Sequence, residues 1–527
     1  MIPLNHPKSS YRCLTALAGA ALLLLAAKAP GADAPAVAVG EFAGAKATLL
    51  AIDDMSFPLR GDLCYYMTTP VVRAEPVLTP SPNHDAPDAS ATHCYGTVLH
   101  EGGKFRMWYY GVGWKKNPEH KTDEKAVLHE GPVCYAESAD GLHWTKPILH
   151  QVNYNGSAEN NAIALPAEET EGAFIVREDD DPDPSRRYKM VYENTSAKRP
   201  TVDTAVSADG ITWHGVGRAA KLLEPSSLYV FDGIYHIGAQ NLSYSGEGGH
   251  LAGRQGFTWI STDFKQWLPE AGESFLLPEP VDPNARGHDR PYTQVHLGVG
   301  GVSYGNVVVG LYCQWHNHPN PGDWFGTGTT YGNLGLLVSS DGQHFREPVK
   351  GYVFLNRHQS WAKIAPYIHS EEILTQSGNS ILNVGDETRI YHGRWMNTEK
   401  VENYYTEIAL ATLPRDRWGA LGLAPMAKAG AVWTAPLTLE KAGDQVAFNA
   451  DGVAGLRVEI ADARFHLLPD YSGANAGTVA GDGLASAVTW PKVGLDALVG
   501  QKVRLRIQFS RSASDDPRLF AAYISGR

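Results

Sequence analysis

The sequence predicts an all-β fold: a five-bladed β-propeller followed by a C-terminal β-sandwich. Three observations predict it. A short motif recurs along most of the chain, and the C-terminal part alternates between apolar and polar side chains. In addition, the 54 glycines and 33 prolines are spread over the whole length. Glycine and proline supply the backbone of tight turns, so this distribution is typical of many short strands.

The repeated motif ends on an aspartate that an aromatic residue follows four positions later. Copies lie at Asp140 and Trp144, Asp209 and Trp213, Asp263 and Trp267, and Asp341 and Phe345, with a degenerate copy at Asp416 and Trp418. In three copies glycine follows the aspartate, a pair that favours a tight hairpin turn because glycine accepts positive φ. An apolar, aromatic strand precedes each copy. Five such units repeated radially predict five blades, in which the aspartates are turn residues and not catalytic groups.

The C-terminal part changes to period-two alternation, in residues 445–449, 456–460, 503–509 and 519–524. Such alternation, with Gly and Asp turns between the strands, is typical of an antiparallel sandwich with one face of each sheet exposed. The sequence therefore predicts three parts: a signal peptide at 1–36, the propeller at 48–425 and the sandwich at 431–527.

The N-terminus has the pattern of a secretory signal. Lys8 and Arg12 precede an apolar run at 14–27, and small residues suited to cleavage follow at 34–38. The run is shorter than the roughly 20 residues of a membrane-spanning helix, so we expect a secreted or periplasmic protein with no membrane span after cleavage. The alternative is an uncleaved membrane anchor.

Four cysteines remain after cleavage of the signal. Cys64, Cys94, Cys134 and Cys313 could form two disulfides, in three possible connectivities, or stay free as buried thiols inside strands. None of them belongs to a CxxC pair of the kind that binds metal.

Charge and motifs exclude several function classes. The net charge is −12 and no basic stripe is present, so nucleic acid is not an expected partner. Dinucleotide and phosphate-loop patterns are absent. His316 and His318 form a lone His-x-His pair, and the acidic run at 178–183 is typical of a solvated turn. We therefore predict no cofactor and no metal.

Function in a propeller is expected at the central shaft, which the first strand of each blade lines. We expect these strands at 93–99, at either 160–165 or 172–176, at 224–231, at 291–296 and at 371–380. Carboxylates near their shaft ends are the catalytic candidates, because glycosidic bond hydrolysis needs one carboxylic acid and one carboxylate. They are Glu193, Glu224, Glu371 and Glu372, with Asp54 and Asp289 behind them.

Other polar and aromatic residues near the shaft are candidates for binding a carbohydrate substrate. Histidine, amide and arginine side chains would hydrogen-bond sugar hydroxyls, and tryptophan rings would pack on sugar faces. The candidates are His93, Tyr95, Trp114, Asn161, Arg290, His296, Trp324 and Gln376.

Several segments carry a resemblance to a known group of proteins. They are residues 95–99, 103–109, 133–147, 181–190, 305–312 and 385–393. From about residue 50 onward the chain resembles uncharacterised secreted proteins, common in planctomycetes, that are related to five-bladed propeller glycoside hydrolases. It is similar, more remotely, to the invertase and arabinanase superfamily.

The resemblance implies an exported glycoside hydrolase that acts on an oligo- or polysaccharide. It assigns no catalytic residue, because the Asn-Asp-Pro-Asn, Arg-Asp-Pro and Glu-Cys motifs of the invertases are absent. A non-catalytic carbohydrate-binding propeller is the alternative.

Overall fold

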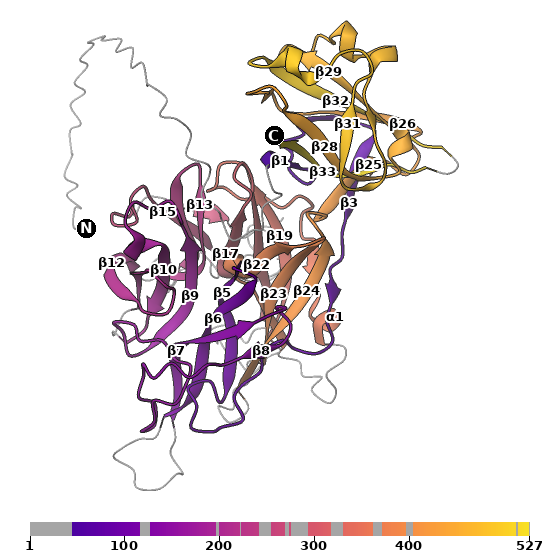
Figure 1. The fold of residues 1–527 in the computed structure, drawn as a ribbon. Helices are drawn as coiled ribbons and strands as arrows, with labels where there is room; N and C mark the ends of the chain where they lie inside the picture. Colours follow the sequence, from indigo (N-terminus) through magenta and orange to yellow (C-terminus); the bar gives the residue numbers. More distant parts are fainter. Residues whose placement is uncertain are drawn as a thin grey trace, which may run out of the picture. The chain divides into compact units, whose positions relative to one another are not determined.

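The computed structural model describes residues 45–115, 127–196, 200–221, 223–241, 255–268, 273–275, 294–317, 330–361, 372–396, 404–512 and 515–525. Within these ranges the regular structure is strand, apart from short 3-10 turns and one helix, α1 (Arg357–Trp361). The predicted all-β fold is confirmed (Figure 1). The predicted signal peptide lies outside the described residues. No described helix is long and apolar enough to cross a membrane.

The described strands between residues 71 and 414 form two four-stranded sheets and one thirteen-stranded sheet, which two single parallel bridges divide into three antiparallel groups, so that five groups follow one another (Figure 1). The first contains β5 (Ala91–Glu101), β6 (Lys104–Lys115), β7 (Val127–Ser138) and β8 (Trp144–Thr145). The second contains β9 (Thr170–Arg177), β10 (Tyr188–Asn194), β11 (Thr201–Ser207) and β12 (His214–Lys221). The third contains β13 (Leu223–Phe231), β14 (Ile234–Asn241), β15 (Gly256–Ser261) and β16 (Glu273–Phe275).

The last two groups have the same antiparallel order. The fourth contains β17 (Gln294–Ser303), β18 (Val308–Asn317), β19 (Thr330–Ser339) and β20 (Val353–Leu355). The fifth contains β21 (Glu372–Thr375), β22 (Ile381–Val384), β23 (Glu387–Met396), β24 (Tyr405–Pro414) and β4 (Val71–Val72). Single parallel bridges, Gly332 to Ile373 and Thr406 to Ala91, connect the fourth group to the fifth and the fifth to the first.

The repeated aspartates are turn residues, as their spacing predicted. Asp140 accepts hydrogen bonds from the backbone N–H groups of Leu142 (2.8 Å) and His143 (2.9 Å). The Oγ of Ser138 accepts from the N–H of Gly141 (2.9 Å), and equivalent bonds recur at the other copies with Asp-Gly. Their carboxylates are committed to the backbone of the turn.

Each of these turns is also held by the preceding group of strands. The indole of Trp108 in the first group donates to Gly210 O in the second (2.8 Å), and the hydroxyl of Tyr229 in the third donates to Gly342 O in the fourth (2.8 Å). Tyr391 in the fifth group donates to Gly141 O in the first (2.9 Å). The repeat therefore links neighbouring groups, the fifth to the first included.

A second set of bonds joins the first strands of the groups. Thr97 on β5 donates to Ala173 O on β9 (2.7 Å), and Ser227 on β13 donates to Val299 O on β17 (3.0 Å). Gln376 donates to His296 O (3.0 Å), and Ser377 donates to Gly96 O (2.5 Å). Asn379 donates to Ile175 O (2.8 Å) and Leu228 O (2.7 Å) and accepts from Leu228 N (2.8 Å). These buried polar groups form a closed chain through all five groups, which we call the hub.

All five first strands are irregular near the hub. Register shifts interrupt the pairing of β5 after His93, of β9 opposite Glu193, of β13 after Pro225 and of β17 after His296. In the fifth group a 3-10 turn, Gly378–Ser380, separates β21 from β22. Bulges of this kind re-aim side chains and are frequent next to active sites.

The C-terminal strands form two further sheets. One has the order β3 (Leu63–Met67), β25 (Gly419–Leu423), β33 (Arg518–Ser525), β28 (Gln445–Asp451), β31 (Gly483–Thr489) and β30 (Thr478–Val479), and β1 (Ala45–Leu50) also pairs with β33. The other has β2 (Leu59–Gly61), β26 (Ala429–Trp433), β32 (Lys502–Ser510) and β27 (Leu437–Thr438), and β29 (Leu456–Asp462) pairs with β32. Side chains of both sheets, among them Phe448 and Ile507, share one core.

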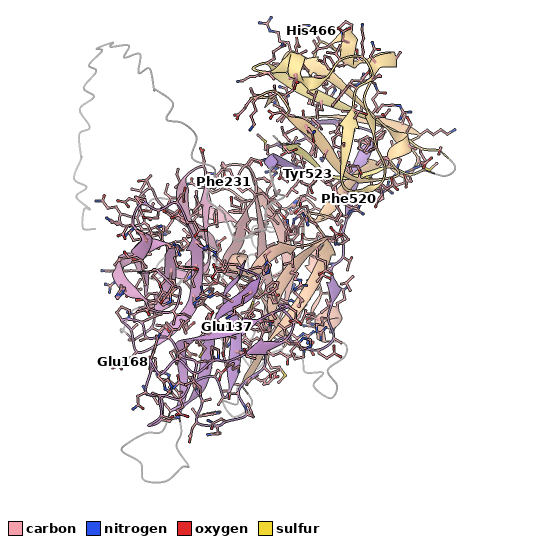
Figure 2. All side chains as sticks on the ribbon, in the orientation of Figure 1. Glu137, Glu168, Phe231, His466, Phe520 and Tyr523 are labelled. Atoms are coloured by element: carbon pink, nitrogen blue, oxygen red, sulfur yellow. The ribbon has the colours of Figure 1, made fainter. Side chains whose placement is uncertain are left out.

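The partition of the chain differs from the predicted one. Residues 45–67 and 419–433, which we placed wholly or partly in the propeller, pair with the C-terminal strands. The reason is that β1 and its partner β33 lie at opposite ends of the chain. Two strands so far apart in the sequence carry no local sequence pattern that would predict their pairing. Tyr523 on β33 then donates to Asp416 (2.8 Å), the degenerate repeat position (Figure 2).

All four cysteines named above are free thiols. Cys94, Cys134 and Cys313 are buried within strands, and Cys64 is half-buried. The structure therefore supports the second of the two alternatives drawn from the sequence.

The hub makes a prediction about stability. Asn379→Ala leaves one backbone N–H and two carbonyl groups in the core without their partner, and each such group costs about 1–3 kcal/mol. We expect the free energy of unfolding to fall by about 3–5 kcal/mol in chemical denaturation. Asn475→Ala, which removes one exposed bond to Pro469 O, is the control. Equal effects of the two substitutions would contradict the role of the hub.

Candidate functional site

Three glutamates from neighbouring strands come together beside the hub. Glu171 lies on β9, Glu193 on β10 and Glu224 on β13, and one carboxylate oxygen of each lies within 4.8 Å of the others. Glu171 and Glu193 are direct partners in the β9–β10 ladder, at its register shift. Like charges placed opposite each other destabilise a sheet, so the folded core accommodates this pair at a cost.

The electrostatics of this cluster favour a bound proton. Burial raises the pKa of Glu171 well above its ordinary value, and the charges of Glu193, Glu130 and Glu224 raise it further. A hydrogen bond with Glu130 acts in the same direction. Carboxylates this close cannot all ionise at neutral pH without a cation, and one of them retains its proton. A protonated acid beside a carboxylate is the combination that acid–base catalysis requires.

Glu224 has a different environment. Its partner in the β13–β14 ladder is Gln240, whose side-chain amide donates a hydrogen bond to the carboxylate. A primary amide N–H is a donor only, so it favours the ionised form. The two ends of the cluster thus differ: the pKa of Glu171 is raised, and the Glu224 carboxylate accepts a hydrogen bond from an amide.

Aromatic side chains border the carboxylates. Ring centroids lie 4.8 Å apart for His93 and Tyr110, 4.4 Å for His296 and Trp315, and 5.7 Å for His93 and Trp395. Tyr95 and Tyr404 belong to the same group, and the chain of contacts closes through Trp315 with Trp395 at 5.9 Å and Trp395 with Tyr404 at 6.2 Å. We call these seven residues the aromatic wall.

The wall lies within the electrostatic field of the glutamates. Burial, with the charges of Glu224 and Glu171, raises the pKa of Tyr95 well above its ordinary value. Burial, with Glu130 and Glu171, does the same for Tyr404. These hydroxyls therefore stay protonated and can donate. The hydroxyl of Tyr95 lies 3.4 Å from Nε2 of His296.

His93 is neutral in this environment. Burial lowers its pKa to about 3, and its Nε2 lies 2.6 Å from the hydroxyl of Tyr404. Its Nδ1 is buried without a hydrogen-bond partner among the described residues. A neutral imidazole with one uncommitted nitrogen can bind a hydroxyl group of a ligand.

Much of the predicted site is brought together. Four of the five first strands contribute to it: His93 and Tyr95 come from β5, Glu224 from β13 and His296 from β17, with Glu171 from β9. Glu193 joins from β10. Gln376 follows β21 and supports His296 through the backbone, so it lies in the hub.

Three predicted residues form contacts elsewhere. Asp54 binds Arg60 (2.9 Å) in the segment that joins the C-terminal sheets. Glu372 lies 3.9 Å from His358 at α1. Asn161 donates to Tyr109 and to Tyr135 O (both 2.8 Å) inside the first group. It does not lie in a first strand, because the first strand of the second group is β9, the later of the two positions predicted for it (160–165 or 172–176).

The position of Asp54 follows from strand geometry. Its neighbour Asp53 accepts from Ser340, just past the end of β19, whereas His296 is paired with Cys313 toward the other end of the same sheet. Val308, the partner of Ser339, and Cys313 are five residues apart along β18, about 17 Å of extended chain. Of the remaining candidates, Trp114 stacks on His84 (6.1 Å between ring centroids). Asp289, Arg290, Trp324 and Glu371 lie outside the described residues.

Sequence reasoning missed Glu171, Glu130, Tyr110, Tyr404 and Gln240. A signal existed for Glu171, which directly precedes the strand predicted at 172–176. For the other four no local pattern exists, because they come from second and third strands that meet the site only through pairing.

The three glutamates are also the single grouping in the described part of the chain with spacing suited to a metal ion. A retained proton relieves the same repulsion without an ion. We therefore do not identify these residues as metal ligands.

The raised pKa of Glu171 predicts a pH dependence of stability. An unfolded-chain glutamate ionises near pH 4.3, at about its unperturbed value, whereas Glu171 keeps its proton to higher pH in the folded protein. The folded state binds the extra proton between these two values, so the free energy of unfolding falls as pH rises, by up to about 1.4 kcal/mol per pH unit.

Glu171→Gln should remove this fall in the free energy of unfolding with rising pH. Thermal unfolding between pH 4.5 and 8 should show the variant gaining stability relative to wild type as pH rises. Glu168→Gln, at an exposed position three residues away, should follow the wild type (Figure 2). Parallel pH curves for wild type and Glu171→Gln would show that Glu171 titrates normally.

Comparisons with known proteins add the following. No family model matches the chain. Rv1502 and MT1551, two uncharacterized proteins of Mycobacterium tuberculosis, are each 32% identical to it over 173 residues, which is 31% of this chain and 48% of theirs. The chain thus spans about half the length of these curated relatives.

Three solved structures are similar at low identity. A glycosyl hydrolase from Bacteroides ovatus matches with a TM-score of 0.42 and 14% identity, over 67% of this chain and 95% of that one. A member of the GH130 family of mannoside phosphorylases and glycoside hydrolases matches with 0.41 and 15%, over 66% and 94%. A family 43 arabinoxylan arabinofuranohydrolase from Bacillus subtilis matches with 0.34 and 11%, over 86% and 99%.

Proposed function

We propose that the protein is an exported glycoside hydrolase that cleaves glycosidic bonds of an oligo- or polysaccharide. One observation carries the proposal: one carboxylate oxygen each of Glu171, Glu193 and Glu224 lies within 4.8 Å of the others, where the pKa of Glu171 is raised and an amide donates to Glu224. The adjoining aromatic wall offers the mixed aromatic and hydrogen-bonding surface that sugar rings bind.

In the proposed reaction Glu171 protonates the leaving oxygen of the glycosidic bond. Glu224 is the carboxylate that attacks the anomeric carbon, and Glu193 keeps Glu171 protonated by its adjacent charge. The proton leaves Glu171 as the bond breaks and a glycosyl–Glu224 ester forms. Water then attacks the anomeric carbon: it gives one proton back to Glu171 and its hydroxyl to the sugar, and the bond to Glu224 breaks. Retaining glycosidases have their carboxyl groups about 5–5.5 Å apart and inverting enzymes about 6.5–9.5 Å apart. The spacing of the cluster therefore supports retention of configuration.

The fold that we propose for this site is a five-bladed β-propeller, with a β-sandwich formed by the C-terminal strands and residues 45–67. The closed hub and the turn-to-neighbour bonds support the ring of five groups. The shared core of the two C-terminal sheets supports the sandwich. In such a ring the first strands line the axis, which is where the candidate residues of β5, β9, β13 and β17 lie.

A glycan-library hydrolysis screen tests the proposed activity. Glu171→Gln and Glu224→Gln should each lower the rate on any cleaved glycan by about 10²–10⁴, the usual contribution of an acid or base group. Glu193→Gln should lower it less, because that residue acts through Glu171. NMR of the fresh product should show the anomer of the substrate.

Asp54→Asn is the control, since it exchanges a predicted carboxylate that lies at the other end of the sheet. Full activity in all three glutamate variants would refute the assignment of the site. Binding of a glycan without cleavage would favour the alternative, a non-catalytic carbohydrate-binding protein.

We propose export on the strength of the N-terminal sequence alone. N-terminal sequencing of the protein recovered from the periplasm or medium should give a start between residues 35 and 39, after the small residues at 34–38. An intact Met1 on cell-associated protein would contradict this.

A further inference from the structure

We propose that Gln240 is a positioning residue, which keeps Glu224 ionised while Glu171 keeps its proton. The inference deepens the proposed function and rests on it. Gln240 lies on β14 directly opposite Glu224, is completely buried and donates a hydrogen bond to the Glu224 carboxylate.

The orientation of the Gln240 amide is determined by its second bond. Its Oε1 accepts from the backbone N–H of Leu297 (2.8 Å). A backbone N–H can only donate, so it must face the carbonyl oxygen of the amide. The Nε2 group is therefore turned toward Glu224, and the reversed amide would place two donors against each other at Leu297 and two acceptors at Glu224.

The backbone at Leu297 is shaped for this bond. Leu297 and Gly298 both have left-handed φ, +58° and +67°. A Cβ on Gly298 would lie 1.8 Å from Ala239 O and 2.7 Å from the nitrogen of Gln240, so only glycine fits. A leucine with positive φ is uncommon, and such positions cluster at functional sites. The bulge after His296 therefore packs against the peptide bond between Ala239 and Gln240.

The opposite side of this bulge is held by the hub. Gln376 donates from Nε2 to His296 O (3.0 Å) and Gly298 O (3.4 Å). Gln240 thus binds the N–H of Leu297, and Gln376, which follows β21, binds the carbonyl groups on either side of Leu297. Together these two buried glutamines hold the Leu297 backbone in place. This arrangement gives Gln240 little freedom to turn away from Glu224.

The surroundings of Glu224 show why such a donor matters. Glu171 on β9 and Glu193 on β10 face it and oppose its ionisation, while the neutral hydroxyl of Tyr95 on β5 lies close by and His296 precedes the bulge. The Gln240 amide accepts no proton and can only donate to the carboxylate, so its bond favours the charge on Glu224 and the proton on Glu171.

The test is the pH profile of two variants on a glycan that the wild type cleaves. Gln240→Leu removes the donor, and the acid limb of kcat/KM should move up by about 1–2 pH units, the usual effect of a hydrogen bond to a charged group. The new carboxyl group in Gln240→Glu can accept from the N–H of Leu297 in either form. It can donate to Glu224 only while it is protonated. It should therefore retain activity at acid pH and lose it as pH rises.

Gln314→Leu is the matched control. Gln314 is a buried glutamine that donates to Tyr312 (3.0 Å) and to Tyr352 O (3.1 Å), away from the carboxylates. It should lower stability without moving either limb. Loss of activity in both Gln240 variants, in step with stability and with unchanged limbs, would overturn the positioning role.

A second readout is independent of catalysis. The carboxyl infrared band of Glu224 can be assigned by the difference between wild type and Glu224→Gln, and then titrated with and without Gln240→Leu. We expect its midpoint to rise by about 1–2 pH units in the variant. An unmoved midpoint would refute the role of Gln240. A moved midpoint in a protein that cleaves no glycan would support Gln240 while refuting the proposed hydrolase activity.

Discussion

The hub of buried hydrogen bonds among the five first strands is the constraint on which the rest of the structure depends. A hydroxyl or amide in the core costs free energy unless its partner is present. Asn379 satisfies groups of two other strands, and Ser377 and Thr97 each satisfy one more. All of these partners are available only when the five groups stand in one register. Apolar packing between sheets would tolerate sliding, whereas the hub does not.

The hub also explains how the site tolerates its own electrostatics. The pairing of Glu171 with Glu193 is unfavourable within its sheet, and the third glutamate adds to the repulsion. Strands fixed by buried bonds a few residues away cannot separate to relieve it. The repulsion is therefore expressed as a raised pKa of Glu171 rather than as a local rearrangement.

The C-terminal strands contribute a different constraint. Asp416, at the degenerate copy of the repeat, accepts hydrogen bonds from Tyr304, Tyr523 and Asn383. Tyr523 belongs to β33, so the last repeat turn is completed by a strand of the C-terminal sheet. The departure of this copy from the Asp-Gly pattern has a structural reason: its carboxylate binds side chains of other elements instead of its own turn.

The all-β class, the Asp-Gly repeat turns and about half of the candidate site could be predicted from the sequence. The turns were predictable because Asp140 and its equivalents bind backbone two and three residues away, which is a local matter. Glu193, Glu224 and His93 were found because they flank predicted strands. That Glu171 faces Glu193 and Gln240 faces Glu224 is set by strand pairing in the folded protein. Those pairs depend on register shifts and on contacts between strands, and no local pattern in the chain encodes which strand a residue will meet.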